Sequence, residues 1–265
     1  MKKAVFVTGA CINTGVAIVE KFASEGWNVV FTGRSPEKVQ AAEKAYQEKF
    51  PDVSIWGYAL DSLVDERTVD EEAVEKLFAD LDAKGIFAET LVLNASDQGL
   101  GMAIFENPLT DFMRVINTNL VWNYFLCEEA SKRMKEQGGG NIVFINSNTA
   151  YRAIPNRIAY SASKGGQLGL MRALALDLGK YNIRVNAVLP GMIRTDRWEK
   201  NPDFYKDVPS RFTPLGDVAD GVDVADAVWY FAAHARNTTG AELTVDGGNT
   251  IQLYPIVPQQ EKPNL

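Results

Sequence analysis

Short apolar runs alternate with longer amphipathic segments along most of the chain. Each apolar run spans four to six residues, which suits a strand buried on both faces, and most of the segments between them are long enough for a helix. Such alternation is typical of β-α units, in which a helix returns the chain to the next parallel strand. The sequence therefore predicts an α/β fold built on a doubly wound parallel sheet.

The pattern places seven strands and the helices that connect them. The strands are expected at Ala4–Val7, Asn28–Phe31, Val53–Tyr58, Thr90–Leu93, Ile142–Ile145, Arg184–Val188 and Glu242–Val245. The helices are expected at about 15–26, 36–49, 68–84, 110–136, 158–181 and 222–235. No linker rich in proline, glycine or serine divides the chain, so residues 1–265 are predicted to form one domain. Residues 192–216 and the tail 249–265 do not follow the alternation of strands and helices, and they are candidates for substrate or subunit contacts.

Composition excludes several classes of protein. The net charge is -7 and the basic residues are scattered, which argues against a nucleic-acid partner. The two cysteines, Cys11 and Cys127, are too few for a disulfide framework and lack the spacing of a metal site. The first apolar run, Ala4–Val7, is too short for a signal peptide, and no stretch approaches the roughly 18 apolar residues of a membrane span. A cytoplasmic protein with no membrane partner and no metal is expected.

Acid-base chemistry is indicated by Tyr160 and Lys164, with Ser147 thirteen residues upstream of the tyrosine. On one helix, the i,i+4 spacing would put the tyrosine and the lysine on the same face, where the ammonium favours the phenolate. The alternative is an ordinary amphipathic surface pair. Because the chain has a single histidine, His234, tyrosine is the stronger candidate for moving a proton near neutral pH.

A phosphate site is indicated by the turn that follows the first strand. Gly9 and Gly15 flank it, and the turn opens into an apolar helix, so backbone N–H groups would face a phosphate. Asn13 stands inside the turn and tolerates a positive φ. After the second strand, Arg34 takes the place of an acidic residue that would bind a ribose hydroxyl. An arginine there suits a 2′-phosphate, which favours NADP over NAD, although it could also be a solvated arginine at a strand end.

Taken in order, these motifs resemble those of the short-chain dehydrogenase/reductase family, from Lys3 to about Gly248. The matching positions are Thr8-Gly9 with Gly15, Asp61, Leu93-Asn94-Ala95-Ser96, Asn119, Ser147, Tyr160 with Lys164, Pro190-Gly191-Met-Ile-Arg-Thr195 and Asp246-Gly247-Gly248. Two positions depart from the family pattern, Asn13 in the glycine turn and Ser96 in place of a glycine.

The resemblance implies a Rossmann-type fold and an oxidoreductase that moves a hydride between a nicotinamide and a secondary alcohol or ketone. It implies that Gly9, Asn13 and Gly15 line the pyrophosphate turn, that Asp61 meets the adenine and Asn94 the ribose side of the cleft, and that Ile193 and Thr195 hold the nicotinamide carboxamide. NADP is the expected cofactor, with NAD as the alternative. A dimer or tetramer, often a homotetramer in this family, is also implied.

The resemblance also assigns catalytic roles. Tyr160 is the general acid or base, Lys164 lowers its pKa and holds the nicotinamide ribose, and Ser147 binds the substrate oxygen. Asn119 is expected to position a water that links Lys164 to solvent.

Other functions remain open on the same fold. They are a 3-oxoacyl-thioester reductase, a cofactor-binding regulatory protein without catalysis, and a dehalogenase, against which Lys164 and Gly15 count.

Basic and aromatic residues bear on the nature of the substrate. Five arginines fall in segments expected near the mouth of the cleft and could attract a carboxylate or phosphate, as in a sugar acid or keto acid. They are Arg152, Arg157, Arg194, Arg197 and Arg211. Trp198, Phe204 and Tyr205 could cover a ring of the substrate. The alternative is that these are surface charges and aromatic residues that pack the loop.

Overall fold

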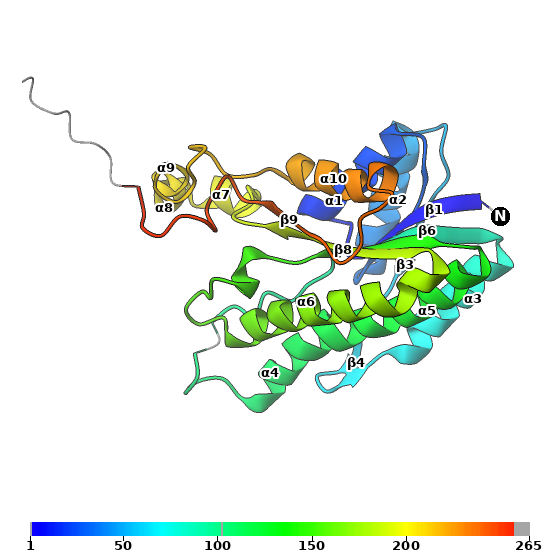
Figure 1. Cartoon of the computed structure of the whole chain (residues 1–265), viewed down its shortest axis with the longest axis horizontal. Coiled ribbons are helices and arrows are strands. Elements are labelled where there is room, and N and C mark those ends of the chain that lie inside the picture. Colours follow the sequence, from blue (N-terminus) through cyan, green and yellow to red (C-terminus); the bar gives the residue numbers. More distant parts are fainter. Residues whose placement is uncertain (1, 102, 257–265) are drawn as a thin grey trace, which may run out of the picture.

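A seven-stranded parallel sheet forms the centre of the protein, in the order β3-β2-β1-β6-β7-β8-β9 (Figure 1). The structure is a computed structural model and describes residues 2–101 and 103–256. The strands are β1 (Lys2–Val7), β2 (Asn28–Gly33), β3 (Ile55–Ala59), β6 (Ile86–Leu93), β7 (Gly140–Ile145), β8 (Ile183–Pro190) and β9 (Glu242–Val245). The predicted Rossmann-type sheet is confirmed.

Helices cover both faces of the sheet, and each face has its own apolar core (Figure 1). One core lies under α1 (Asn13–Ser24), α2 (Pro36–Lys49) and α10 (Gly221–Trp229). The other lies under α3 (Glu71–Ala83), α5 (Trp122–Glu136) and α6 (Ile158–Leu178). The strands are buried on both sides, as their continuous apolar sequences predict.

The expected helix at 68–84 begins later than predicted. A short hairpin, β4 (Leu63–Asp65) and β5 (Thr68–Val69), precedes it. Asp65 accepts a hydrogen bond from the backbone N–H of Arg67 at 2.8 Å and so stabilises the turn of the hairpin. Asp70 then caps α3 by accepting from the N–H of Ala73 at 3.0 Å. The acidic side chains here specify a turn and a cap, which apolar periodicity alone does not reveal.

The expected single helix at 110–136 is interrupted. It consists of α4 (Leu109–Ile116), a π-helical turn η1 (Asn117–Val121) and α5. A π turn inserts one extra residue into a helix and often marks a functional site. Asn119 lies inside this turn and is fully buried.

The segment 192–216 forms three short helices, α7 (Asp196–Lys200), α8 (Pro202–Tyr205) and α9 (Val208–Phe212). The rings of Trp198 and Tyr205 stack there with their centres 4.4 Å apart. The side chain of Phe204 lies outside the described part of the structure, as do residues 257–265 of the expected tail.

The described part of the tail is held by Arg152. Its Nη1 donates to the carbonyl oxygens of Asn249, Thr250 and Gln252 at 2.5, 3.2 and 2.6 Å. Further along, the N–H of Ile256 donates to the carbonyl of Arg211 at 2.8 Å. The tail therefore lies against the loop after β7 and against α9.

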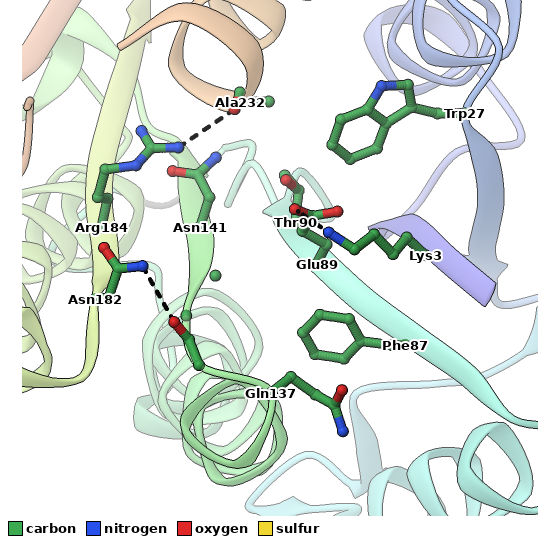
Figure 2. A pocket seen from close by; sticks show the side chains of 13 residues that line it. Lys3, Trp27, Phe87, Glu89, Thr90, Gln137, Asn141, Asn182, Arg184 and Ala232 are labelled. Atoms are coloured by element: carbon green, nitrogen blue, oxygen red, sulfur yellow. Dashed lines mark hydrogen bonds and ion pairs between the residues drawn. The ribbon is translucent and has the colours of Figure 1, made fainter. Parts of the chain in front are cut away.

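A cavity of about 440 Å³ opens at the amino ends of the central strands (Figure 2). Lys3 and Glu89 form an ion pair at its wall, at 3.2 Å. Arg184 donates to the carbonyls of Phe231 and Ala235 at 2.6 and 2.9 Å, so its guanidinium is already occupied. This cavity lies at the edge of the sheet away from Ser147, which follows the carboxyl end of β7. Within the described residues, no helix combines the length and apolarity that crossing a bilayer requires.

Candidate active site

The turn after β1 has the shape that a phosphate site needs. Gly9 has φ +67°, and Asn13, the first residue of α1, has φ 49°. A Cβ on Gly15 would lie 2.5 Å from the carbonyl oxygen of Gly9 and 2.7 Å from the Cα of Ala10, so only glycine fits there. Asn13 thus takes the left-handed conformation expected of it, and the backbone is free to approach a ligand.

Asn94 holds this turn from the neighbouring strand. Its Nδ2 donates to the carbonyls of Thr8 and Gly9 at 2.9 and 3.1 Å. The hydroxyl of Thr8 accepts in return from the N–H groups of Asn94 and Ala95, both at 2.9 Å. The side-chain amide is therefore used to shape the turn, a structural task that the sequence-based prediction did not include.

The other predicted cofactor residues lie around the same edge of the sheet. Arg34 follows β2, is exposed, and makes no hydrogen bond or ion pair with other described residues. Asp61 is exposed after β3 and accepts from the N–H of Ser62 at 2.7 Å. Ile193 and Thr195 follow β8, where Thr195 precedes α7.

A second cation near the turn was missed in the sequence. Burial raises the pKa of the Cys11 thiol, and the charge of Lys38 opposes that rise, which puts Lys38 close to the turn. Lys38 lies in the first turn of α2, three residues after the Ser35 cap. Lys38 follows Arg34 in the sequence, and the first turn of α2 faces the same edge of the sheet as Arg34. This position could have indicated a second cation at the site.

Tyr160 and Ser147 meet, as their spacing predicts. Tyr160 lies near the start of α6, and Ser147 follows β7. Part of Tyr160 faces solvent, but burial of its phenol raises the pKa. The Ser147 hydroxyl, hydrogen-bonded to the phenol, and the charge of Arg157 both oppose that rise.

Lys164 lies on the same face of α6 and is buried beside the phenol ring. The residue is 2% exposed, its Nζ donates to the carbonyl of Ile145 at 2.8 Å, and it lies 5.5 Å from the centre of the Tyr160 ring. Burial lowers the pKa of Lys164 to about 7. A buried amine without a carboxylate is less readily charged near neutral pH, so the expectation that Lys164 lowers the pKa of Tyr160 stays a prediction.

Asn119 has its side chain fully engaged. Its Oδ1 accepts from the N–H of Asp97 at 2.7 Å and from the hydroxyl of Ser96 at 3.2 Å. Its Nδ2 donates to the carbonyl of Asp97 at 2.8 Å and to the hydroxyl of Ser163 at 3.0 Å. Ser96, the departure from the family glycine, thus binds a predicted catalytic residue.

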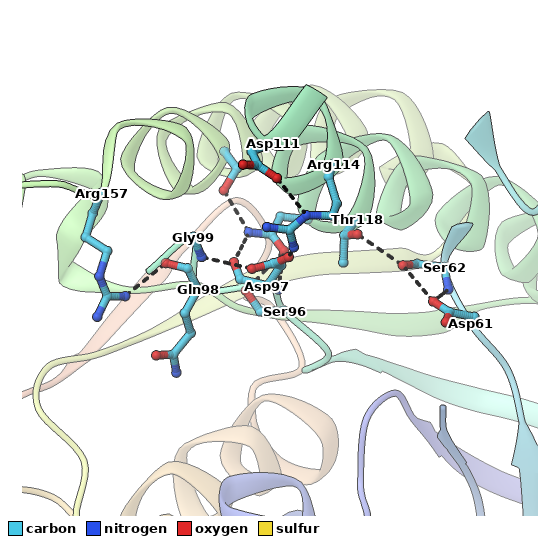
Figure 3. Close-up of polar contacts among 12 residues, drawn as sticks. Asp61, Ser62, Ser96, Asp97, Gln98, Gly99, Asp111, Arg114, Thr118 and Arg157 are labelled. Carbon is cyan, nitrogen blue, oxygen red and sulfur yellow. Dashed lines mark hydrogen bonds and ion pairs between the residues drawn. The ribbon is translucent and has the colours of Figure 1, made fainter. Parts of the chain in front are cut away.

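Asn119 holds the loop after β6, and two arginines from other elements also contact this loop (Figure 3). Arg114 forms an ion pair with Asp97, and Asp97 Oδ1 accepts from the N–H of Gly99 at 2.9 Å. At the far end of this loop, the carbonyl of Gln98 accepts from Arg157 at 2.9 Å. The loop therefore ties the π turn to the arginine beside Tyr160.

The five candidate substrate arginines divide into two groups. Arg152 holds the tail, and Arg194 pairs with Asp217 and Asp220 at 2.6 and 3.3 Å. Arg211 lies over the ring of its neighbour Phe212, 5.7 Å from its centre. Of the five, Arg157 is the one for which the described residues show a contact with Tyr160, and Arg197 lies near Arg157.

Arg197 lies within range of the charge of Arg157. Burial lowers the pKa of Arg157, and so does the charge of Arg197, which places the two guanidinium groups near one another. Neither arginine forms an ion pair with a carboxylate among the described residues. Two neighbouring arginines, one of them beside a phenol that can move a proton, form a suitable site for an anionic substrate.

The comparisons with known proteins now decide the family. The profile of the family described as enoyl-(acyl carrier protein) reductase matches residues 9–250. The chain belongs to the short-chain dehydrogenase/reductase family. It is an oxidoreductase of that family, and its sheet and helices match those of solved members.

Named relatives cover nearly the whole chain. An L-rhamnose 1-dehydrogenase (NAD(P)+) from Azotobacter vinelandii is 33% identical over 95% of this chain and 98% of its own length. The 3-oxoacyl-[acyl-carrier-protein] reductase MabA from Mycobacterium bovis is 30% identical over 94% of this chain and 93% of its own. Among solved structures, ElxO with NADP bound has a TM-score of 0.84 at 29% identity, covering 95% of this chain and 100% of that one.

Proposed function

We propose that this short-chain dehydrogenase/reductase uses NADP and acts on a secondary alcohol or ketone that carries a carboxylate, such as a sugar acid or keto acid. The observation that carries the proposal is Arg157, which lies beside Tyr160 with Arg197 near it, neither with a carboxylate partner among the described residues. The sugar dehydrogenase among the relatives is consistent with a small polar substrate.

The residues present fit a nicotinamide dinucleotide. Gly9 and Gly15 leave the turn free of side-chain atoms where a pyrophosphate would lie, and α1 begins there. Arg34, exposed and unpaired among the described residues, would hold a 2′-phosphate, with Lys38 as a second cation. Asp61 would meet the adenine, and Ile193 and Thr195 the carboxamide. The structural neighbour ElxO binds NADP, which supports this choice of cofactor.

The chain's own residues would then handle the proton and the substrate oxygen. When bound, the nicotinamide supplies or accepts the hydride. Tyr160 keeps its proton through neutral pH because burial raises its pKa, so it can protonate a carbonyl oxygen during reduction. Ser147, which contacts the phenol, would hydrogen-bond the same oxygen, and Lys164 would hold the ribose. Arg157 and Arg197 would bind the carboxylate and so fix the carbonyl against Tyr160.

A matched pair of ketones tests the substrate proposal. Acetoacetate and methyl acetoacetate differ in one negative charge, so NADPH oxidation with each reports on recognition of the carboxylate. We expect Arg197→Gln to raise the KM for acetoacetate by about tenfold or more, the usual value of a charge-assisted hydrogen bond, and to leave the ester unaffected. Arg236→Gln, an exposed arginine at the opposite edge of the sheet, is the matched control. Equal use of both ketones by the wild type would contradict the proposal.

Tyr160→Phe separates an enzyme from a cofactor-binding regulatory protein. We expect this variant to lose turnover while NADPH still increases its fluorescence on binding, because the phenyl ring keeps the packing of the site. Full turnover by the variant would exclude Tyr160 as the acid. NADPH binding by a wild type that reduces no ketone would favour the regulatory protein.

A 3-oxoacyl-thioester reductase is the second candidate, supported by the MabA relative. Acetoacetyl-CoA carries the same ketone on a thioester and distinguishes the two functions. A much higher kcat/KM for the thioester than for acetoacetate would favour this alternative.

We also propose a dimer or tetramer. Leu253 and Tyr254 of the tail are 77% and 76% exposed, as is expected of a segment that packs on another subunit. Light scattering on the wild type and on Leu253→Asp tests this, and a monomeric wild type would contradict it.

A further inference from the structure

Gln167 links the π turn to the helix that carries Tyr160 and Lys164. It lies one turn after Lys164 on α6 and is 1% exposed. Its Nε2 donates to the main-chain carbonyl of Asn119 at 2.5 Å. Its Oε1 accepts from Asn146 Nδ2 at 3.1 Å, so both ends of the amide are used.

Asn146 extends this connection to the residues beside the substrate. Its Nδ2 also donates to the carbonyl of Lys164 at 2.9 Å, and its Oδ1 accepts from the N–H of Ser147 at 2.8 Å. Asn146 is 4% exposed. The two amides therefore form a continuous chain of buried hydrogen bonds that joins Asn119, Lys164 and Ser147.

The chemistry of a buried amide pair explains why its geometry matters. A primary amide donates at one end and accepts at the other, so each link has a direction and a wrong side chain leaves a buried group unpaired. Asn146 and Gln167 are also almost completely buried, where side chains are locked by packing. A displacement of about 1 Å in a catalytic group can lower a rate about a hundredfold.

We propose that Gln167 and Asn146 are positioning residues that hold Ser147 and Lys164 in register with Asn119, and that turnover depends on their hydrogen bonds. Asn119, which the family resemblance expects to position a water, has its main-chain carbonyl bonded to the Gln167 amide. The proposal rests on the oxidoreductase activity of the family and does not depend on the carboxylate proposed for the substrate.

Gln167→Leu removes both hydrogen bonds with little change in volume. We expect kcat to fall about tenfold while the KM for the ketone and the affinity for NADPH change less than twofold, because Asn146 still bonds the carbonyl of Lys164 and the displaced Ser147 acts on the reacting oxygen. The assay uses whichever of acetoacetate, methyl acetoacetate and acetoacetyl-CoA the wild type reduces fastest. Gln137→Leu, on an exposed glutamine at the other end of the sheet, is the matched control.

The pH profile of kcat in Gln167→Glu distinguishes a positioning role from a merely structural one, which would leave that profile unchanged. A protonated carboxyl can still donate to the Asn119 carbonyl and accept from Asn146, whereas an ionised one cannot donate. Burial raises the pKa of a carboxyl, so the new side chain should titrate near neutral pH. We expect kcat to be near the wild-type value at low pH and to fall about tenfold through one additional ionisation, to the level of Gln167→Leu. Circular dichroism at both pH values shows whether the fold persists.

Hydrogen exchange measures the connection without any substrate. In Gln167→Leu, residues 117–121 and 146–149 should exchange faster than in the wild type and in Gln137→Leu. Unchanged exchange in these segments overturns the proposal whether or not a ketone has been found. A wild-type kcat in Gln167→Leu, or a wild-type pH profile of kcat in Gln167→Glu, also overturns it. If Gln167→Leu fails to fold, the pH profile of Gln167→Glu decides.

Discussion

The guanidinium carbon of Arg157 lies 5.9 Å from the centre of the Tyr160 ring. Its charge and the Ser147 hydroxyl hold down the pKa of a phenol that burial raises. An arginine therefore acts on the phenol in addition to Lys164, to which the family resemblance assigns the lowering of this pKa.

Replacing Arg157 should shift the pH dependence of the reaction. Removing its charge leaves burial less opposed, so the pKa of Tyr160 rises further. We expect Arg157→Gln to move the rising limb of kcat/KM for alcohol oxidation to higher pH, since oxidation needs the phenolate. Arg236→Gln should leave the profile where it is. A limb that moves to lower pH in Arg157→Gln would contradict the assignment.

Lys164 should make the folded state more stable as pH rises above neutrality. Its pKa is lowered to about 7 in the folded protein and is ordinarily about 10.4, so the unfolded chain binds more protons between these values. The free energy of unfolding should then increase with pH by at most about 1.4 kcal/mol per unit in that window.

Urea unfolding of the wild type and Lys164→Met between pH 7 and 8.5 measures this effect. Below pH 8.5 the ordinary cysteine and tyrosine pKa values are not yet passed, so Lys164 dominates the difference. The variant should lose the positive slope. The same slope in both proteins would show that Lys164 remains charged when buried.

Arg34 should decide between the two nicotinamide cofactors. Its exposed guanidinium, unpaired among the described residues, suits a phosphate and gains nothing from a hydroxyl. We expect Arg34→Ala to weaken NADPH binding by about tenfold or more and to leave NADH binding unchanged. Fluorescence titration with both cofactors measures it. Equal weakening of both would indicate that the turn itself was damaged.

Asn13 should tolerate glycine and resist a β-branched residue. Its φ of 49° is left-handed, a region that glycine enters freely and valine avoids. We expect Asn13→Gly to unfold at nearly the wild-type urea concentration and Asn13→Val to lose about 1–2 kcal/mol. An equal loss in both variants would assign the role of Asn13 to its side chain and not to its backbone.

The sheet and most helices could be predicted from the sequence because their signals are local. The continuous apolar strands, the Ser35 cap and the left-handed Asn13 each depend on a few neighbouring residues. The hairpin at 63–69 and the later start of α3 were missed because Asp65 and Asp70 specify them through hydrogen bonds within one short acidic segment. Apolar periodicity does not detect such bonds.

The sequence predicted which residues form the candidate site, but it predicted the contacts between them less well. Tyr160 and Ser147 meet as expected, because helix and strand ends converge at one edge of the sheet. The roles of Arg157, Asn146 and Gln167 depend on contacts between residues up to 59 positions apart. The available signal was a polar residue at an apolar position, which marks a buried hydrogen bond without naming its partner.

The π turn at 117–121 also determines how mutations along this helix should be interpreted. One additional residue rotates everything after it by about 100° relative to the helix before it. A helical wheel drawn through 110–136 as one unbroken helix would therefore assign the wrong face to either the first or the second half. Deleting one residue in the turn would restore a regular helix, but it would turn Trp122 and Leu126, now in the core, toward a different neighbour. The number of residues in this turn is therefore fixed by the packing of the helix that follows it. For protein engineers, substitutions in the turn are safer than insertions or deletions.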